Sequence, residues 1–213
     1  MQTISRMPFT TVKTEGGILP ADLLSRIAAG TVDGLQPTHY HLAPTERLNE
    51  AISRSWNRLL GVWRSFDDRR NILDESDRGT TLTREGWLLI LFQELGYGRL
   101  PFTGRLSIED STGDQRTYPI SHLWEHTPIH LVSFRQELDR RDAAVGRSPH
   151  SLLQEVLNRS SEALWGFTSN GLRLRLLRDN ASLTRTAYVE FDLEAMLAGE
   201  LYSDFSLLWL VCH

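Results

Sequence analysis

Two pairs of histidines are the first candidates for chemistry, because their spacing could place two imidazoles on one metal ion. His39 and His41 lie two positions apart, which suits one face of a strand, and His122 and His126 lie four apart, which suits one face of a helix. Neither pair has a cysteine nearby or a clear third ligand. The sequence therefore favours loop or half-buried histidines over a metal site, and we predict no metal.

Basic side chains gather around one predicted strand in the second half of the chain. Strict alternation over 171–176 puts the leucines on one face and Arg173 and Arg175 on the other, with Asn170 in the preceding turn and Arg178 just beyond. Further arginines leave the neighbouring elements, at Arg135, Arg140, Arg141 and Arg159. Clustered guanidinium groups suit phosphate, because their fork can bind two oxygens at once.

This pattern leaves two interpretations open. The first is a DNA or phosphate contact, with Arg135, Asn170, Arg173, Arg175 and Arg178 as the candidate residues. The second is a solvated outer face, on which the arginines pair with Asp179, Glu190 and Asp192.

The composition is that of a folded protein with no overall attraction to nucleic acid. The chain has 213 residues, of which 40% are hydrophobic and 23% charged, and its net charge is −4. Any contact with DNA must therefore come from a local basic patch. The single cysteine, Cys212, lies in an apolar run, which predicts an inert buried thiol, excludes an internal disulfide and suits a reducing compartment. With no apolar leader and no run of about 18 apolar residues, we expect a cytoplasmic protein without a membrane span.

The order of predicted elements indicates an α/β (α+β) fold with a mixed sheet and an N-terminal helical extension. Helices are predicted at 21–29, 45–69, 83–95, from Ser148 onward and at 193–197, where Asp192 is the cap. Strands are predicted as a hairpin within 105–120 around a Ser-Thr-Gly-Asp turn, a strand in PIHLVSF (128–134), a hairpin at 165–176 and a strand at 186–191. The last residues, DFSLLWLVCH, predict a helix with no stop signal, so we expect the chain to continue beyond His213.

The second half of the chain resembles a known family. The order helix, hairpin, strand, helix, strand is that of the PD-(D/E)XK nuclease core. The segment SPHSLLQEVLNRSSEALWGFTSNGLRLRLLRDN (148–180) is similar to the N-terminal domain of type IIG-like restriction-modification enzymes. TREGWLLILFQELGYG (83–98) looks like the entry helix of the same domain, and the resemblance covers about residues 80–213.

The resemblance implies a nuclease-like domain placed before an adenine DNA methyltransferase, as in the DISARM and BREX phage-defence systems. Neither the N-P-P-Y loop nor the glycine-rich cofactor loop of the methyltransferase is present, so S-adenosylmethionine and methylation are expected beyond His213. The implied division is a helical extension at 1–80, a nuclease-like domain at 81–200, and the start of a connecting helix at 201–213.

The positions that correspond to the family's active site have lost its central groups. Ser133 and Arg135 stand where the motif has an acid and a lysine, Glu94 corresponds to the acid of the entry helix, and Gln154 to a polar residue of the next helix. A neutral hydroxyl cannot replace a carboxylate on Mg²⁺, and an arginine does not readily release a proton. We therefore predict a domain that does not cut DNA but contacts the backbone of double-stranded DNA or partner subunits.

Two alternatives remain beside this prediction. One is an active nuclease whose acids are Glu94, Asp110 and Glu125, and the other is a protein-docking module without a role in DNA binding.

Overall fold

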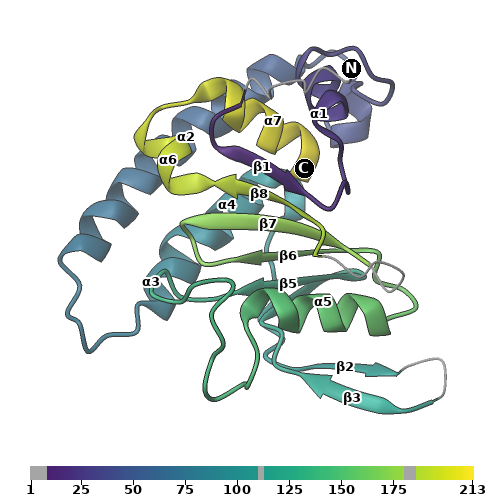
Figure 1. Ribbon diagram of the computed structural model, residues 1–213. Helices are drawn as coiled ribbons and strands as arrows, with labels where there is room; N and C mark the ends of the chain where they lie inside the picture. The colour runs from purple at the N-terminus through teal and green to yellow at the C-terminus, as the bar shows by residue number, and fades with distance from the viewer. Residues whose placement is uncertain (1–8, 110–112, 180–185) are drawn as a thin grey trace, which may run out of the picture.

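The predicted mixed α/β fold is confirmed by a computed structural model, which describes residues 9–109, 113–179 and 186–213 (Figure 1). Its main sheet has the strand order β1-β8-β7-β6-β5-β4, and β5 and β6 are parallel while the other neighbours are antiparallel. These strands are β1 (Val12–Glu15), β4 (His122–Trp124), β5 (Thr127–Leu131), β6 (Trp165–Ser169), β7 (Arg173–Arg178) and β8 (Tyr188–Asp192). A separate hairpin consists of β2 (Leu106–Glu109) and β3 (Gln115–Tyr118).

Most helices form one layer against the sheet. They are α1 (Ala21–Ala28), η1 (Pro37–Tyr40), α2 (Leu48–Asn71), α3 (Thr80–Thr83), η2 (Arg84–Leu88), α4 (Leu89–Phe92), η3 (Gln93–Tyr97), α6 (Leu193–Ala198) and α7 (Tyr202–Cys212). The predicted apolar face of α2 is buried, and Trp56, Leu59 and Phe66 share one core with Ile129 of β5 and Leu174 of β7. Burial of this continuous apolar surface is what holds the helical layer on the sheet.

The N-terminal extension contributes a strand as well as helices. The sequence suggested only a short helix before position 43, whereas β1 pairs with β8 along the edge of the main sheet. Asp204 of α7 fixes the entry to β1, because its carboxylate accepts hydrogen bonds from the Thr11 amide and hydroxyl at 2.9 and 2.6 Å. The extension therefore completes the sheet.

The helix predicted at 83–95 extends over 80–97 and contains two π-helical turns, η2 and η3. It is buried around Trp87, whose indole N–H donates to the carbonyl of Gly171 at 2.8 Å. Gly96 has a φ of 86°, the left-handed conformation expected at the helix end. The helix packs beneath the β6–β7 turn and carries Arg84 toward the end of β5.

The opposite face of the sheet is covered by α5 (Pro149–Arg159) and approached by the β2–β3 hairpin (Figure 1). Ser148 caps α5 as predicted, since its hydroxyl accepts from the Ser151 amide at 3.1 Å, and Asp192 caps α6 in the same way. The short strand β4 was not predicted. The predicted turn between β2 and β3 includes residues 110–112, which lie outside the described residues. Within the described part of the chain, no helix is both long and apolar enough to cross a membrane.

Candidate nucleic-acid interface

Ser133 lies two residues beyond the end of β5 and acts as a structural link. Its hydroxyl donates a hydrogen bond to the carbonyl of Arg78 and accepts one from the Arg135 amide at 3.1 Å. The side chain is buried, and the neighbouring Phe134 amide donates to the Thr83 hydroxyl at 3.0 Å. The end of β5 is therefore attached to the loop that follows α2.

Arg135 continues the same attachment. Its guanidinium donates to the carbonyls of Leu73 and Asp74 at 3.2 and 3.0 Å, and it lies 5.0 Å from the centre of the Phe134 ring. These carbonyls belong to the loop that follows α2, and the Asp74 carbonyl also accepts from the Asp77 amide at 3.0 Å. The side chain is nevertheless exposed, so its outer N–H groups face solvent.

Glu94 and Gln154 lie in different layers. Glu94 belongs to η3 in the large helical layer, where it forms an ion pair of 2.7 Å with Arg58 of α2. Gln154 lies on α5, and its amide donates to the Asn158 side chain and to the Arg178 carbonyl at 2.8 and 3.0 Å. Because the sheet separates these layers, the structure does not bring Glu94, Gln154 and the end of β5 to one point.

The acids of the alternative nuclease site are distributed as well. Glu125 lies in the turn between β4 and β5 with a φ of 50°, and Asp110 is outside the described residues. Among the described residues, no three His, Cys, Asp or Glu side chains form a group that could hold a metal ion.

The arginines of β7 are neutralised by carboxylates. Arg175 is buried and binds Asp139 with two hydrogen bonds of 2.6 and 2.7 Å and Glu190 with one of 2.5 Å. Burial by itself lowers the pKa of Arg175, but the hydrogen bonds to Asp139 and Glu190 raise this pKa above its usual range. Arg173 pairs with Glu190 at 3.0 Å and with Asp192 at 3.5 Å. Two of the three acids in the second sequence interpretation are therefore the partners of these arginines.

Asn170 and Arg178 complete the predicted set. Asn170 shapes the β6–β7 turn: its side chain accepts from the amides of Leu172 and Arg173 and donates to the Gln136 carbonyl. Arg178 lies 5.5 Å from the centre of the Trp165 ring at the far end of β7. Of the five predicted DNA contacts, only Arg135 lies on the hollow described next.

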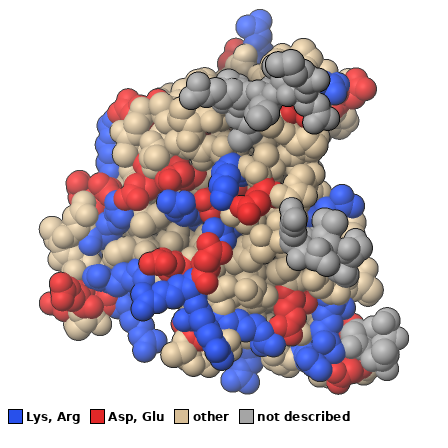
Figure 2. Space-filling model, in the orientation of Figure 1, with Lys and Arg blue, Asp and Glu red and all other residues tan. Residues whose placement is uncertain are grey.

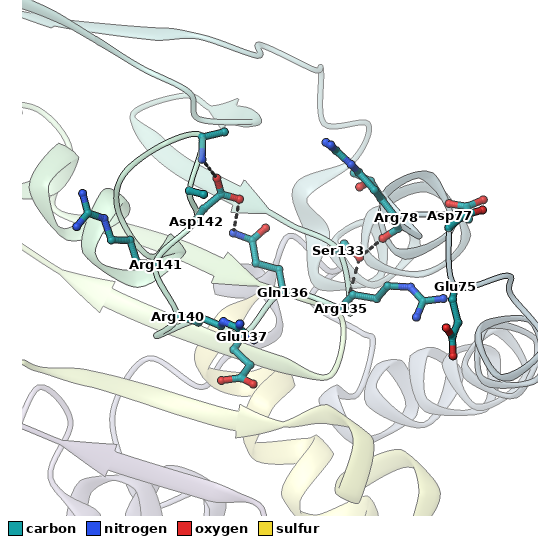
Figure 3. A pocket seen from close by; sticks show the side chains of 14 residues that line it. Glu75, Asp77, Arg78, Ser133, Arg135, Gln136, Glu137, Arg140, Arg141 and Asp142 are labelled. Atoms are coloured by element: carbon teal, nitrogen blue, oxygen red, sulfur yellow. Dashed lines mark hydrogen bonds between the residues drawn. The ribbon is translucent and has the colours of Figure 1, made fainter.

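An open groove of about 540 Å³ lies between the loop after α2 and the loop after β5. Figure 3 shows Arg78 and Arg135 on one side of this groove, with Arg140 and Arg141 on the opposite loop. Figure 2 shows many blue side chains over the lower half of the same face, interrupted by acidic ones. We call Arg78, Arg135, Arg140 and Arg141 the groove arginines.

The acidic side chains of the groove either bind backbone amides or lie at its lower side in Figure 3. Asp77 accepts from the Gly79 amide at 2.7 Å, and Asp142 accepts from the amides of Ala144 and Val145 at 2.8 and 3.1 Å. Figure 3 shows the carboxylates of Glu75 and Glu137 at the lower side of the view, with the guanidinium groups of Arg78 and Arg141 above them. Arg78, Arg140 and Arg141 form no ion pair with any described residue.

The two histidines of each pair considered in the sequence do not bind the same groups. The His39 ring bonds to the Gly34 carbonyl at 2.9 Å, and His126 pairs with Glu162 at 3.0 Å. His122 is buried instead, and its ring bonds to the Ser121 hydroxyl at 2.8 Å. Burial, with a smaller effect from the charge of Arg84, lowers the pKa of His122 to about 4.

We expect the depressed pKa of His122 to make the protein less stable in mild acid. The unfolded chain binds a proton near pH 6.5 while the folded chain resists it until about pH 4, so stability falls as the pH drops through this window. Between pH 7.5 and 5 the loss is roughly 2 kcal/mol for this residue. Urea unfolding of the wild type and of His122→Gln checks this, and the variant should lose less stability over that interval. An equal loss in both would contradict it.

Comparison of this chain with known proteins assigns it to no family. No protein-family model, no curated protein and no solved structure matches the chain.

Proposed function

We propose that this chain is a non-catalytic module that binds the backbone of double-stranded DNA in the groove between the loops after α2 and β5. The observation that carries the proposal is the state of the groove arginines. Arg78, Arg140 and Arg141 have no carboxylate partner among the described residues, and Arg135 bonds only to backbone carbonyls. Such a cluster suits phosphate groups best. Each DNA phosphate that an arginine neutralises releases counterions from the DNA, which favours binding.

The contrast with β7 supports this location. The charges of Arg173 and Arg175 are matched by Glu190, Asp139 and Asp192, so they add little to the attraction for a polyanion. The groove arginines come from two loops attached through Ser133 and Arg135, and this attachment holds their backbones in place before a ligand arrives. Preorganised contacts cost less ordering on binding.

The structural roles of Ser133 and Arg135 also support the absence of cleavage. Both side chains hold the α2–α3 loop against the end of β5. In this proposal the domain keeps the mixed sheet of a PD-(D/E)XK nuclease and uses the end of the central strand for support. Its place in a restriction or phage-defence methyltransferase, with S-adenosylmethionine bound by another region, stays a prediction.

The test is fluorescence anisotropy with a labelled DNA duplex over a series of salt concentrations. We expect the double variant Arg140→Ala/Arg141→Ala to bind at least about tenfold more weakly than the wild type at low salt. The slope of log K against log salt should fall by about 2, because each lost phosphate contact removes about 0.9. Among the described residues, neither side chain has a hydrogen-bond or ion-pair partner, so the double variant should fold.

A matched control carries the same change in net charge elsewhere. Arg47→Ala/Arg64→Ala removes two exposed arginines, one immediately before α2 and one within it, and we expect this variant to bind DNA nearly as well as the wild type. Equal losses in the two double variants would overturn the groove and indicate non-specific attraction. No salt-dependent binding by the wild type would favour the docking module.

A further inference from the structure

A second, smaller pocket adjoins the groove and holds a cation that forms no ion pair with a described carboxylate. It has a volume of about 170 Å³ and shares Thr80, Ser133 and Gln136 with the groove. Arg84 and His130 line it, together with Phe102, Ser121 and Val132. Among the described residues, no Asp or Glu lines this pocket, in contrast to the groove.

Arg84 is half-buried and poorly satisfied. Its guanidinium has five N–H donors, and among the described residues it makes one hydrogen bond, from Nη2 to the Leu131 carbonyl at 3.1 Å. Its Nε is buried without a partner, and it forms no ion pair with a described carboxylate. Removing a charge from water costs free energy unless an opposite charge or hydrogen bonds replace the water. An anion in the pocket would supply both.

The other polar groups of the pocket fit the same ligand. The Nδ1 of His130 is buried and has no hydrogen-bond partner among the described residues. Burial, with a smaller effect from the charge of Arg84, lowers the pKa of His130 to about 4. At neutral pH this imidazole is neutral and can donate one N–H to an oxyanion. Thr80, which carries a hydroxyl donor, lines both the pocket and the groove.

Phe102 adds an apolar surface at the mouth. Its side chain is exposed by 66%, which is unusual for a phenylalanine, and its ring centre lies 5.2 Å from the Arg84 guanidinium carbon and 5.8 Å from the His122 ring centre. An exposed aromatic ring beside a cation is a typical platform on which a nucleobase stacks. The cation and the ring therefore indicate the two parts of a nucleotide.

We propose that the Arg84 pocket binds the phosphate monoester of a nucleotide, with Phe102 stacking on the attached base. Arg84 provides the charge, and His130 and Thr80 provide further donors. Two sources carry this group, a free mononucleotide and the 5′-phosphorylated end of a nucleic-acid strand. Binding in the pocket depends on the residues that line it and does not require that the groove binds DNA.

Isothermal titration calorimetry of the full chain tests the pocket with four probes. We expect adenosine 5′-monophosphate to bind and adenosine to bind at least about tenfold more weakly, because the charge-assisted hydrogen bonds are lost. A single-stranded oligonucleotide with a 5′-phosphate should bind more tightly than the same strand with a 5′-hydroxyl if strand ends are the source. Equal binding of those two strands, with tight binding of the monophosphate, would assign the pocket to free nucleotides.

Three variants separate the contributions. Arg84→Met should weaken binding of the monophosphate at least about tenfold, Phe102→Ala several-fold, and Arg99→Met, an exposed arginine after the same helix, not at all. Arg84→Met removes an unpaired charge, so its melting temperature should not fall. The monophosphate should raise the melting temperature of the wild type and of Arg99→Met but not that of Arg84→Met.

Two results would overturn the proposal. One is equal binding of adenosine and its monophosphate by the wild type, and the other is unchanged binding of the monophosphate by Arg84→Met. If Arg84→Met does not fold, Arg84→Lys keeps a charge but lacks the fork, and full binding by that variant would also contradict the role of the guanidinium. The variant Arg140→Ala/Arg141→Ala should retain monophosphate binding, so a failure of the groove is distinguishable from a failure of the pocket.

Discussion

Replacing Arg175 by methionine should destabilise the protein by about 3 to 5 kcal/mol, because it removes one partner of a buried ion pair. Arg175 is buried together with Glu190, and it also holds Asp139 of the loop after β5 by two hydrogen bonds. Without the guanidinium, Arg173, which is exposed, is the one ion-pair partner that Glu190 keeps among the described residues. A carboxylate left in an apolar environment with little compensation is costly. Urea unfolding followed by tryptophan fluorescence at pH 7.5 measures the change.

Two comparisons make this result specific. Arg173→Met removes the outer arginine while leaving the buried pair, and we expect a loss of at most about 1 kcal/mol. The double variant Arg175→Met/Glu190→Met should recover much of the stability, since apolar side chains of similar volume often replace a buried pair at little cost. A loss below about 1 kcal/mol in Arg175→Met would contradict a buried structural role for this arginine.

Placing an acid at position 133, just beyond β5, should not create nuclease activity. It should instead destabilise the fold. Ser133→Asp places a carboxylate where the hydroxyl donates to the Arg78 carbonyl, so two acceptors face each other in a buried position. We expect a loss of about 2 to 4 kcal/mol, compared with about 1 to 2 kcal/mol for Ser133→Ala. Urea unfolding of both variants at pH 7.5 provides the comparison.

A cleavage assay completes this test. Ser133→Asp/Arg135→Lys, incubated with supercoiled plasmid and Mg²⁺ or Mn²⁺, should leave the DNA intact, because the structure does not bring Glu94 and Gln154 to the end of β5. Metal-dependent cleavage that disappears on Glu94→Ala would contradict our interpretation and favour an active nuclease.

The sequence alone predicted most elements of the fold because their signals are local. The apolar face of α2, the Ser148 and Asp192 caps and the alternation along β7 depend on residues close in the chain, and all of them are confirmed. The strands β1 and β4 escaped prediction because each is short and forms by pairing with a partner strand. For β1, that partner is β8, far along the chain.

The candidate site was only partly predictable for the same physical reason. Alternation correctly put Arg173 and Arg175 on the face opposite the leucines, but it could not show that Asp139 folds back onto Arg175 from a distant loop. Charge clusters in a sequence do not reveal which members become neutralised. The tertiary structure decided this by burying Arg175 with Glu190, while the groove arginines form no ion pair with a described carboxylate although acidic residues line the same groove.

The stretch around Ser133 and Arg135 illustrates the division most clearly. Residue types alone established that this strand lacks the acid and the lysine of a nuclease motif, because a hydroxyl and a guanidinium cannot do their chemistry. Only the tertiary structure showed what the two side chains do instead, since the carbonyls of Arg78, Leu73 and Asp74 come from a loop more than 50 residues earlier. Such contacts depend on how the chain folds back on itself.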